Sequence, residues 1–337
     1  MQNRQFRLAA RPVGLAKESD WKLTSDPVAA PGDGEVLVKV LQLSLDPAMR
    51  GWMNEGRSYI QPVGLGEVMR ATGIGKVSAS KNPAFKEGDL VAGGFGIQEY
   101  CLVADPKKFN LHKIDPRLGT PAQWLNALGM PGMTAYFGLL DVGQPKEGDT
   151  VVVSGAAGAV GQTVGQIARI KGCRVVGVAG GKAKCDFVVN DLKFDACIDY
   201  KAGKVKEGLR QHCPNGVDVY FDNVGGDILE VVLTHINRGA RIVICGAISQ
   251  YNNTTPVKGP STYMMLLVAR ARMQGMVVFD YADRYGEAIK QIAQWIKEGK
   301  LISREDIVDG IETFPATLNK LFSGGNFGKL VLRVARE

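Results

Sequence analysis

The sequence predicts an α/β protein in which a doubly wound parallel sheet is joined to an antiparallel, barrel-like β domain. The first observation is a strand, a glycine-rich turn, a helix and a second strand over residues 149–181. The second is the alternation of strand-like and helical patterns that follows this unit. The third is the stretch 1–123, where short β-like segments are separated by glycine and proline. With 337 residues, the chain is long enough for two such domains.

The strand, turn and helix predict a phosphate site. Residues 151–153 are valines, and such a run is typical of a strand buried on both faces. Glycines at every third position of 155–161 come next, and apolar residues at helical spacing continue towards Gly172. Backbone N–H groups at the start of that helix have no partner within it and suit a pyrophosphate. Because the spacing is GxxGxxG and not GxGxxG, an alternative stays open in which the glycines only allow tight packing.

The remaining elements follow from periodicity and from glycine and proline. Further strands of the parallel sheet are expected at 174–178, 195–200, 217–222, 240–245 and 275–280. In the N-terminal part, strands are expected at 35–45, 67–78, 88–92 and 97–103. Residues 121–140 predict a helical connector that is interrupted near 131–132, and 285–296 predict an amphipathic helix. Residues 307–334 return to a β-like pattern with a short helix and are expected to fold back, which gives domains of 1–123 with 305–337, and 124–304.

Composition disfavours several classes of function. The net charge is +7, but the basic residues are dispersed, so nucleic-acid binding is not expected and the charge favours at most an anionic cofactor. The six cysteines form no CxxC pair and the three histidines have no metal-ligand spacing, so no metal site is expected. The N-terminus lacks a signal-peptide core, and no apolar stretch is long enough to span a membrane. A cytoplasmic protein without membrane partners is therefore predicted.

The end of the second strand predicts which dinucleotide is bound. An NAD site normally has an Asp or Glu at this point, where it accepts hydrogen bonds from the ribose hydroxyls. Here Gly180 and Gly181 follow the strand, and Lys182 and Lys184 come directly after them. Glycine leaves room for a 2′-phosphate and Lys184 can supply a positive charge, so NADPH is preferred to NADH. The alternative for the two lysines is a solvated helix start.

Five motifs together resemble one known family over nearly the whole chain. They are LDPAMRG at 45–51, GAAGAVG at 155–161, FDNVGG at 221–226, CGAISQYN at 245–252 and GNFGKLVLRV at 325–334. This combination resembles the prostaglandin reductase branch of the medium-chain dehydrogenase/reductase superfamily, which includes leukotriene hydroxydehydrogenases, plant double-bond reductases and bacterial curcumin reductases. The resemblance implies a Rossmann domain, a GroES-like domain, no catalytic zinc, and a homodimer formed through an open sheet edge at 276–279. It also implies NADPH-dependent reduction of the carbon–carbon double bond of α,β-unsaturated ketones or aldehydes.

The resemblance also implies a set of cofactor contacts. Lys184 and Tyr200 would bracket the 2′-phosphate, and Asn326 would orient the nicotinamide carboxamide. For Asn223 and Asn326 the alternative is ordinary loop chemistry, and for Tyr200 and Thr134 it is a place at the edge of the core. The full set is Thr134, Gly158, Ala159, Val160, Gly161, Gly180, Lys184, Tyr200, Asn223, Cys245, Gly246, Ala247, Ile248, Ser249, Tyr251, Met276, Val277, Val278 and Asn326.

Two tyrosines are the candidate catalytic residues. Hydride transfer to the β-carbon of an enone leaves an enolate, which needs a hydrogen-bond donor at its oxygen and a source of a proton. Tyr251 is the first candidate and Tyr59, in the polar loop 54–61, is the second. Alternatively both only line the pocket, and water or a cofactor hydroxyl supplies the proton. A polar loop at 252–261 would border the substrate.

Apolar side chains near these tyrosines would suit a bulky hydrophobic enone or alkenal. They are Met49, Trp52, Met53, Met264 and Met265, although methionine and tryptophan are more often simply core residues. Two other functions stay open at this stage. One is an NADPH quinone reductase of the same superfamily, and the other is a non-catalytic protein that senses NADPH.

Overall fold

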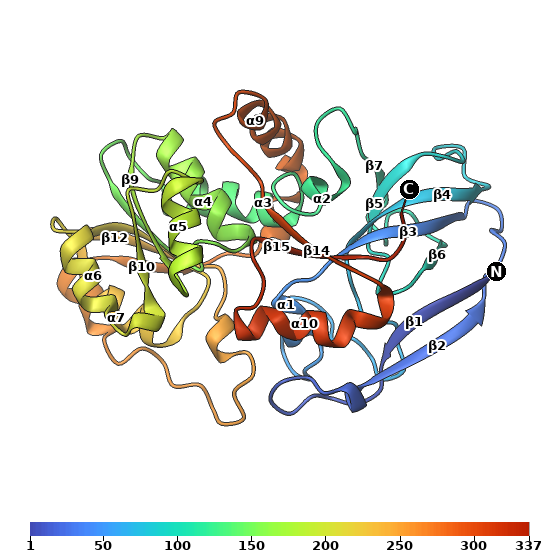
Figure 1. Ribbon diagram of the computed structural model, residues 1–337, viewed down its shortest axis with the longest axis horizontal. Coiled ribbons are helices and arrows are strands. Elements are labelled where there is room, and N and C mark those ends of the chain that lie inside the picture. The colour runs from blue at the N-terminus through green and yellow to red at the C-terminus, as the bar shows by residue number, and fades with distance from the viewer. Residues whose placement is uncertain (337) are drawn as a thin grey trace. The chain divides into compact units, whose positions relative to one another are not determined.

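The computed structural model describes residues 1–336, which form two compact units (Figure 1). The first unit comprises Met1–Leu125 and the segment that starts at Glu305, and the second is Asn126–Arg304. The C-terminal segment therefore belongs with the N-terminal part of the chain. None of the helices within residues 1–336 has the length and apolar character that crossing a membrane requires.

The second unit is built on a parallel sheet of six strands, in the order β10-β9-β8-β11-β12-β13. The strands are β8 (Thr150–Ser154), β9 (Arg174–Ala179), β10 (Ala196–Asp199), β11 (Val217–Asp222), β12 (Ile236–Ile244) and β13 (Arg272–Gly275). The chain winds outward from β8 through β9 to β10, and then from β11 to β13 on the other side. This order confirms the predicted doubly wound Rossmann sheet and places its switch point between β8 and β11.

Helices fill the connections between these strands, and helices also stand before β8 and after β13 in the chain. They are α3 (Met130–Phe137), α4 (Ala159–Ile170), α5 (Lys182–Asn190), α6 (Val205–His212), α7 (Gly226–Leu233), α8 (Met264–Ala269) and α9 (Tyr285–Lys297). All five residues of β8 are buried, as its run of valines predicts. A Cβ on Gly165 of α4 would lie 1.8 Å from the Phe194 ring, so glycine at this position lets the aromatic ring pack directly against the helix backbone.

The sixth strand was predicted at the wrong place. The expected strand at 275–280 is found at Arg272–Gly275, and Val278–Arg284 forms 3-10 turns instead. The apolar run that suggested a strand is accounted for by Val278, which is buried and accepts a hydrogen bond at its carbonyl from the Tyr285 hydroxyl at 2.9 Å. A short apolar run does not distinguish a strand from another buried segment. The residues proposed as a cofactor-binding strand, Met276–Val278, thus follow the strand.

Proline has a different role in the connector from the one expected. Pro131 stands in the first turn of α3 and does not interrupt a longer helix. Its missing N–H costs nothing there, because the first N–H groups of a helix have no partner within the helix. The short helix α2 (Pro121–Trp124) precedes it, and six residues in a π-helical conformation, Gly138–Gly143, follow α3.

The first unit contains a mixed sheet, in the order β14-β15-β3-β4-β5-β7 with β6 paired to β3. Its strands are β3 (Val36–Ser44), β4 (Gly73–Ser80), β5 (Leu90–Gly93), β6 (Tyr100–Val103), β7 (His112–Lys113), β14 (Glu305–Asp309) and β15 (Lys329–Arg333). A separate antiparallel pair, β1 (Gln2–Leu8) and β2 (Trp21–Pro27), was not predicted. The expected antiparallel pairing holds except between β14 and β15, which are parallel because α10 (Phe314–Ser323) forms a crossover between them.

A buried ion pair joins two of the sequence motifs within the first unit. Lys329 on β15 is 1% exposed, and its Nζ donates to the Leu45 carbonyl at 2.8 Å and to Asp46 Oδ1 at 2.6 Å. Asp46 also accepts a hydrogen bond from the Ser44 hydroxyl. Burial lowers the pKa of Lys329, and the Asp46 carboxylate opposes that shift. Motifs 45–51 and 325–334 therefore share a structural role, since each supplies one side of this pair.

Candidate cofactor site and the Tyr59 region

The glycine turn after β8 leaves an uncapped helix start. Gly155 has φ +62°, a backbone conformation that suits glycine, and no side chain caps α4 at Gly158. A Cβ on Gly161 would lie 2.3 Å from the Gly155 carbonyl oxygen, so α4 rests directly on the turn. The N–H groups of the first turn of α4 are thus presented beside backbone that a ligand can approach closely. These features fit a dinucleotide pyrophosphate. The close contact at Gly161 also agrees with the alternative in which the glycines allow tight packing.

The switch point of the sheet is held by hydrogen bonds between the ends of β8 and β11. The Asn223 backbone N–H donates to Ser154 Oγ at 2.9 Å, and the Asn223 side chain donates from Nδ2 to the Ser154 carbonyl at 2.7 Å. Asn223 therefore joins the two strands, and its Oδ1 atom is an acceptor. Because ligands of doubly wound sheets bind at the carboxyl ends of the strands beside the switch point, Asn223 lies where a cofactor contact is expected.

Asp222 organises this region, and it was missed by the sequence reasoning. Its Oδ1 atom accepts hydrogen bonds from Ser154 Oγ at 2.9 Å, the Tyr220 hydroxyl at 2.8 Å, and the backbone N–H groups of Val224 and Gly225 at 3.0 and 2.9 Å. Asp222 is 1% exposed, and its Oδ2 atom is buried without a hydrogen-bond partner among residues 1–336. Burial raises the pKa of Tyr220 well above its usual value, so this hydroxyl stays a donor. The feature of the sequence that could have revealed Asp222 is an aspartate at the end of an apolar strand.

The segment after β12 is bonded to the same strand end. The N–H groups of Cys245 and Gly246 donate to the Asp222 carbonyl at 2.9 and 3.1 Å. The Ile248 N–H donates to the Asn223 carbonyl at 3.2 Å, and the Ser249 hydroxyl donates to the Val224 carbonyl at 2.6 Å. Burial raises the pKa of the Cys245 thiol to about 12, and Asp222 adds to this shift, so the thiol is neutral and a poor nucleophile at pH 7. Residues 245–251 are thereby fixed beside the switch point.

Tyr251 belongs to this fixed segment. Its hydroxyl oxygen accepts a hydrogen bond from the Ala247 N–H at 3.1 Å, and a Cβ on Gly246 would lie 2.8 Å from the same oxygen. The phenol is partly buried and folded back onto its own strand end. An accepted N–H bond makes the phenol O–H a better donor, which is the property needed at a developing enolate.

At the other end of the site, Tyr200 lies directly against Gly180. A Cβ on Gly180 would be 2.7 Å from the Tyr200 hydroxyl oxygen, so glycine is required for this contact. Lys184 stands in the first turn of α5, one turn from Gly181. The end of β9 has no carboxylate of its own, but the structure brings Asp199 of β10 to the Gly181 N–H, which donates to its Oδ1 at 2.8 Å. That oxygen also accepts from the Lys201 N–H at 3.0 Å, so backbone donors already occupy it.

Several predicted cofactor contacts do not lie with the residues described above at the strand ends of the second unit. Thr134 is buried on α3, where its hydroxyl donates to the Met130 carbonyl at 2.8 Å. Asn326 lies in the first unit, in a turn where its Nδ2 donates to the Gly328 carbonyl at 2.9 Å. The tyrosine candidates also belong to different units. The structure therefore assembles Gly158–Gly161, Gly180, Lys184, Tyr200, Asn223 and 245–251 along the strand ends of one sheet.

Tyr59 is 56% exposed in the first unit, and its hydroxyl accepts from Trp52 Nε1 at 3.4 Å. Met49 and Met53 flank Trp52 and are 0% exposed, so they are core residues and do not line an open pocket. Met264, in the second unit, is 49% exposed. The described chain offers no group of three or more His, Cys, Asp or Glu side chains that could hold a metal ion.

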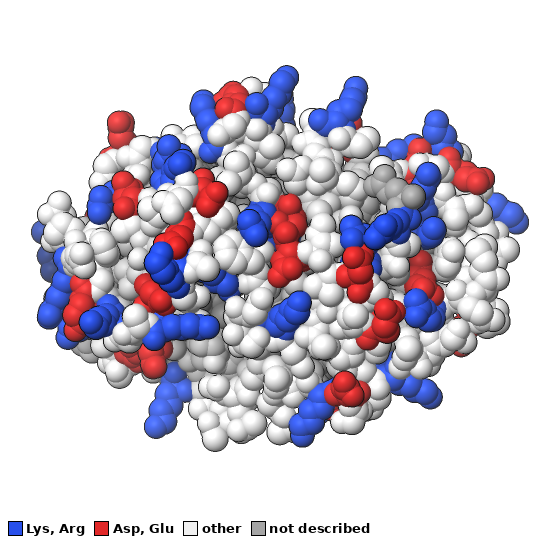
Figure 2. Space-filling model, in the orientation of Figure 1, with Lys and Arg blue, Asp and Glu red and all other residues white. Residues whose placement is uncertain are grey.

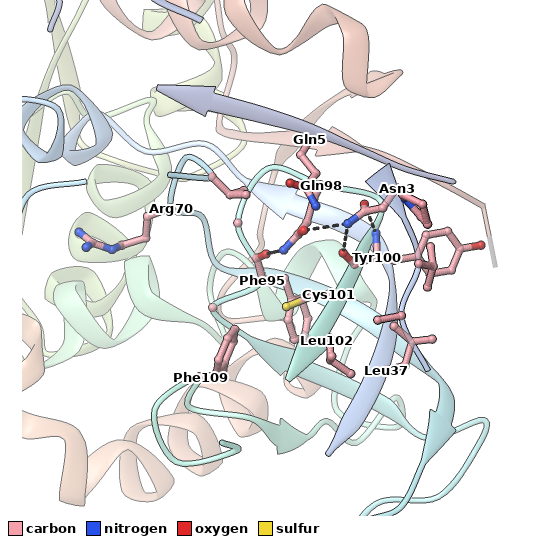
Figure 3. A pocket seen from close by; sticks show the side chains of 16 residues that line it. Asn3, Gln5, Leu37, Arg70, Phe95, Gln98, Tyr100, Cys101, Leu102 and Phe109 are labelled. Atoms are coloured by element: carbon pink, nitrogen blue, oxygen red, sulfur yellow. Dashed lines mark hydrogen bonds between the residues drawn. The ribbon is translucent and has the colours of Figure 1, made fainter. Parts of the chain in front are cut away.

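A separate cavity of about 500 Å³ lies within the first unit (Figure 3). Its amide groups bond to one another, since Asn3 Nδ2 donates to Gln98 Oε1 at 3.0 Å and to the Tyr100 carbonyl at 2.8 Å. On the face drawn in Figure 2, basic and acidic side chains are interspersed without a large patch of one sign. This distribution agrees with the dispersed charge in the sequence.

The fold and the site together define a dinucleotide-binding protein with a Rossmann sheet. Residues 4–111 match the family model described as the N-terminal domain of oxidoreductase, and residues 159–294 match the model described as zinc-binding dehydrogenase. The NADPH-dependent curcumin reductase of Escherichia coli is 45% identical, over 99% of this chain and 98% of that protein. The 2-alkenal reductase (NADP(+)-dependent) of Nicotiana tabacum is 41% identical, over 99% and 98%.

A solved structure extends this similarity to the fold. CurA of Vibrio vulnificus, crystallised in complex with NADPH, is 44% identical and covers 99% of this chain and 100% of its own, with a TM-score of 0.93. The chain thus belongs to the medium-chain dehydrogenase/reductase superfamily, in the zinc-independent branch of curcumin, alkenal and prostaglandin reductases. This confirms the family that the five motifs indicated.

Proposed function

We propose that this protein uses NADPH to reduce the carbon–carbon double bond of α,β-unsaturated ketones or aldehydes. The observation that carries the proposal is the uncapped start of α4 at the switch point, together with a β9 end that offers glycine and lysine in place of a carboxylate. The names of the similar reductases support the same cofactor and the same kind of reaction. In its most general form, the proposal describes an NADPH-dependent oxidoreductase. That general description agrees with the branch to which the chain belongs.

The residues of the second unit divide the binding of NADPH between them. The first turn of α4 would hold the pyrophosphate, and Tyr200 with Lys184 would hold the 2′-phosphate. Asn223 and the backbone of 245–249 would contact the nicotinamide half at the strand ends. Thr134, Met276–Val278 and Asn326 remain proposed contacts of that half. When bound, the cofactor supplies the hydride.

Tyr251 is proposed to donate a hydrogen bond to the enolate oxygen, with Tyr59 as the second donor. The hydroxyl oxygen of Tyr251 accepts from the Ala247 N–H in the segment after β12, so a backbone contact fixes the place of this oxygen. Preorganised donors lower the barrier because they do not have to reorient as charge develops. In this scheme residues 1–123 and 305–337 form the substrate domain, and 124–304 form the cofactor domain.

Replacing Tyr251 with Phe should lower kcat by about tenfold or more, because the enolate loses a preorganised donor. The KM for NADPH should stay within about threefold, since the hydroxyl bonds to the Ala247 N–H and not to a phosphate-binding group. Steady-state kinetics with a saturating enone would measure both constants. Tyr136→Phe is a suitable control, because the Tyr136 hydroxyl donates to Glu287, which is not among the proposed cofactor contacts. Unchanged kcat in Tyr251→Phe would remove this residue from the mechanism.

The direct test of the function is NADPH oxidation with a series of enones and alkenals of increasing size, repeated with NADH. Turnover of enones with NADPH is the expected result, and a preference for NADH would contradict the interpretation of Gly180 to Lys184. Preferential turnover of quinones would favour the quinone reductase alternative. Tight NADPH binding without oxidation by any of these acceptors would favour the sensing alternative.

We also propose a cytoplasmic homodimer that contacts neither nucleic acid nor membranes. Strand β13 lies at the end of the sheet, and α8 beside it exposes Met264, Leu267 and Val268 at 49%, 68% and 59%. Light scattering after size exclusion should give about twice the mass of the chain, and Leu267→Arg should shift it towards the monomer because a charge would be placed in an apolar interface. A monomeric wild type would contradict this assembly.

A further inference from the structure

Two cysteines that the proposed function does not use face each other where α5 packs against β9 and β10 (Figure 1). Cys197 on β10 is the register partner of Gly177 on β9. A Cβ on Gly177 would lie 2.8 Å from Val188 Cγ1 of α5, so this face of the sheet is the one that α5 covers. Register partners point to the same face, and Cys185 lies on α5 one turn before Val188. The backbone therefore directs both cysteines into one interface.

Hydrogen bonds agree with this placement and bring the two sulfur atoms into contact. At the start of α5 the Gly181 N–H donates to Asp199 Oδ1 at 2.8 Å. Asp199 lies two residues after Cys197, so both side chains are on the same face of β10. One turn further along α5, the Cys197 thiol donates a hydrogen bond to the Cys185 sulfur. Both cysteines are partly exposed, so a small molecule in solution can reach the pair.

Cys185 is the sulfur of the pair that is better suited to attack an oxidant. Burial raises the pKa of the Cys185 thiol, and the hydrogen bond from Cys197 opposes this rise because it stabilises a thiolate. Burial also raises the pKa of Cys197, and the same hydrogen bond adds to that rise. Because both pKa values are raised, the pair reacts slowly and stays reduced unless an oxidant accumulates.

We propose that Cys185 and Cys197 form a reversible disulfide that lowers the affinity of the protein for NADPH. The oxidant is a small disulfide such as oxidised glutathione. The Cys185 thiolate attacks one of its sulfur atoms, so a mixed disulfide forms at Cys185 and one glutathione thiolate leaves. The Cys197 sulfur then attacks Cys185, and the protein disulfide forms as the second glutathione thiolate leaves. The two cysteine protons end on the released thiolates, so the protein loses two electrons and the glutathione disulfide gains them.

The disulfide would connect the two parts of the proposed 2′-phosphate site, so the inference rests on the proposed function. Lys184 precedes Cys185 on α5, and Tyr200 follows β10 three residues after Cys197. A disulfide brings two sulfur atoms to about 2 Å, which is closer than hydrogen-bonded thiols stand, so α5 must move towards β10. Tyr200 cannot follow this movement freely, because its hydroxyl lies directly against Gly180. The 2′-phosphate site is thereby distorted, whereas NADH has no 2′-phosphate to lose.

The test measures the dissociation constants of NADPH and NADH by fluorescence titration, before and after treatment with oxidised glutathione. Oxidation should raise the constant for NADPH by about tenfold and the constant for NADH by less than about threefold. Dithiothreitol should restore both. Trypsin cleaves after Lys184, Lys193 and Lys201, so mass spectrometry should find peptides 185–193 and 194–201 linked in the oxidised protein.

Two variants assign the effect to this pair of thiols. Cys185→Ser cannot form the disulfide, so its affinity for NADPH should not change on oxidation. Cys173→Ser is the matched control, because Cys173 lies in the same unit and its thiol donates to the Lys146 carbonyl at 3.3 Å. A serine hydroxyl is also a donor, so this variant should respond to oxidation like the wild type.

The outcomes separate this inference from the proposed function. Absence of the linked peptides, a disulfide that leaves NADPH affinity unchanged, an equal loss for NADH, or the same loss in Cys185→Ser would overturn the inference alone. Failure of the reduced wild type to bind NADPH would refute the proposed function and the inference with it. A selective and reversible loss of NADPH affinity that requires Cys185 would support the inference.

Discussion

Replacing Gly161 with Ala is expected to abolish measurable NADPH binding and to lower the free energy of unfolding by about 3 kcal/mol. The new Cβ would lie 2.3 Å from the Gly155 carbonyl oxygen, 2.8 Å from its carbonyl carbon and 2.9 Å from the Ala156 Cα. These are backbone atoms of the turn that precedes α4, so no side chain can move aside to relieve the clash. The helix start would have to shift away from the turn that shapes the phosphate site. Fluorescence titration with NADPH and denaturant unfolding would measure the two effects.

Two other glycines provide controls for this substitution. A Cβ on Gly286 in α9 meets nothing within 4 Å, so Gly286→Ala should be neutral or stabilise by up to about 1 kcal/mol. A Cβ on Gly158 would lie 3.1 Å from the Gly155 oxygen and needs only a small adjustment, so Gly158→Ala should fold while binding NADPH less tightly. NADPH binding by Gly161→Ala at wild-type affinity would show that the contact of α4 with the turn does not shape the site.

The sequence predicts the local elements of this site better than it predicts how strands and crossovers are connected. The valine run of β8 and the glycines after it are determined by neighbouring residues, so pattern alone places the strand, the turn and the start of α4 correctly. The apolar run at 276–279 fails as a strand because burial can be achieved by 3-10 turns as well. The parallel pairing of β14 with β15 depends on where α10 crosses, which no periodicity records.

Contacts between residues distant in the chain were beyond the sequence reasoning. Asp222 bonds to Ser154, which lies 68 positions earlier, and Lys329 bonds to Asp46, which lies 283 positions earlier. Such pairs need the fold before they can be recognised, although the family motifs already contained all four residues or their neighbours. Tyr251 was singled out as a polar residue after a strand and stays a prediction as a catalytic residue, and its bond to the Ala247 N–H follows from a turn that the sequence does not specify.

Removing the Asp222 carboxylate should destabilise the protein and weaken NADPH binding together. In Asp222→Ala the Ser154 and Tyr220 hydroxyls and two backbone N–H groups lose their common acceptor in a buried region, which should cost about 3–5 kcal/mol. Asp222→Asn keeps the shape and one acceptor oxygen, so about 1–2 kcal/mol is expected. Its NADPH affinity should fall by about tenfold, because the side chain holds the Val224 and Gly225 N–H groups of the turn that contains Asn223, together with the Ser154 hydroxyl that accepts from the Asn223 N–H.

Asp218→Asn is a control for Asp222→Asn, because it removes a charge from the same strand at a different position. It lies near the other end of β11, where its two oxygens accept from the Thr150 N–H and from Asn237 Nδ2, each at 2.8 Å. Asp218→Asn should therefore lower the free energy of unfolding by about 1 kcal/mol and leave the NADPH dissociation constant unchanged. A loss of affinity in Asp222→Asn but not in Asp218→Asn would assign a positioning role to the carboxyl end of β11. Equal affinities in both variants would reduce Asp222 to a purely structural residue, because the sheet would then hold the cofactor-binding segments without it.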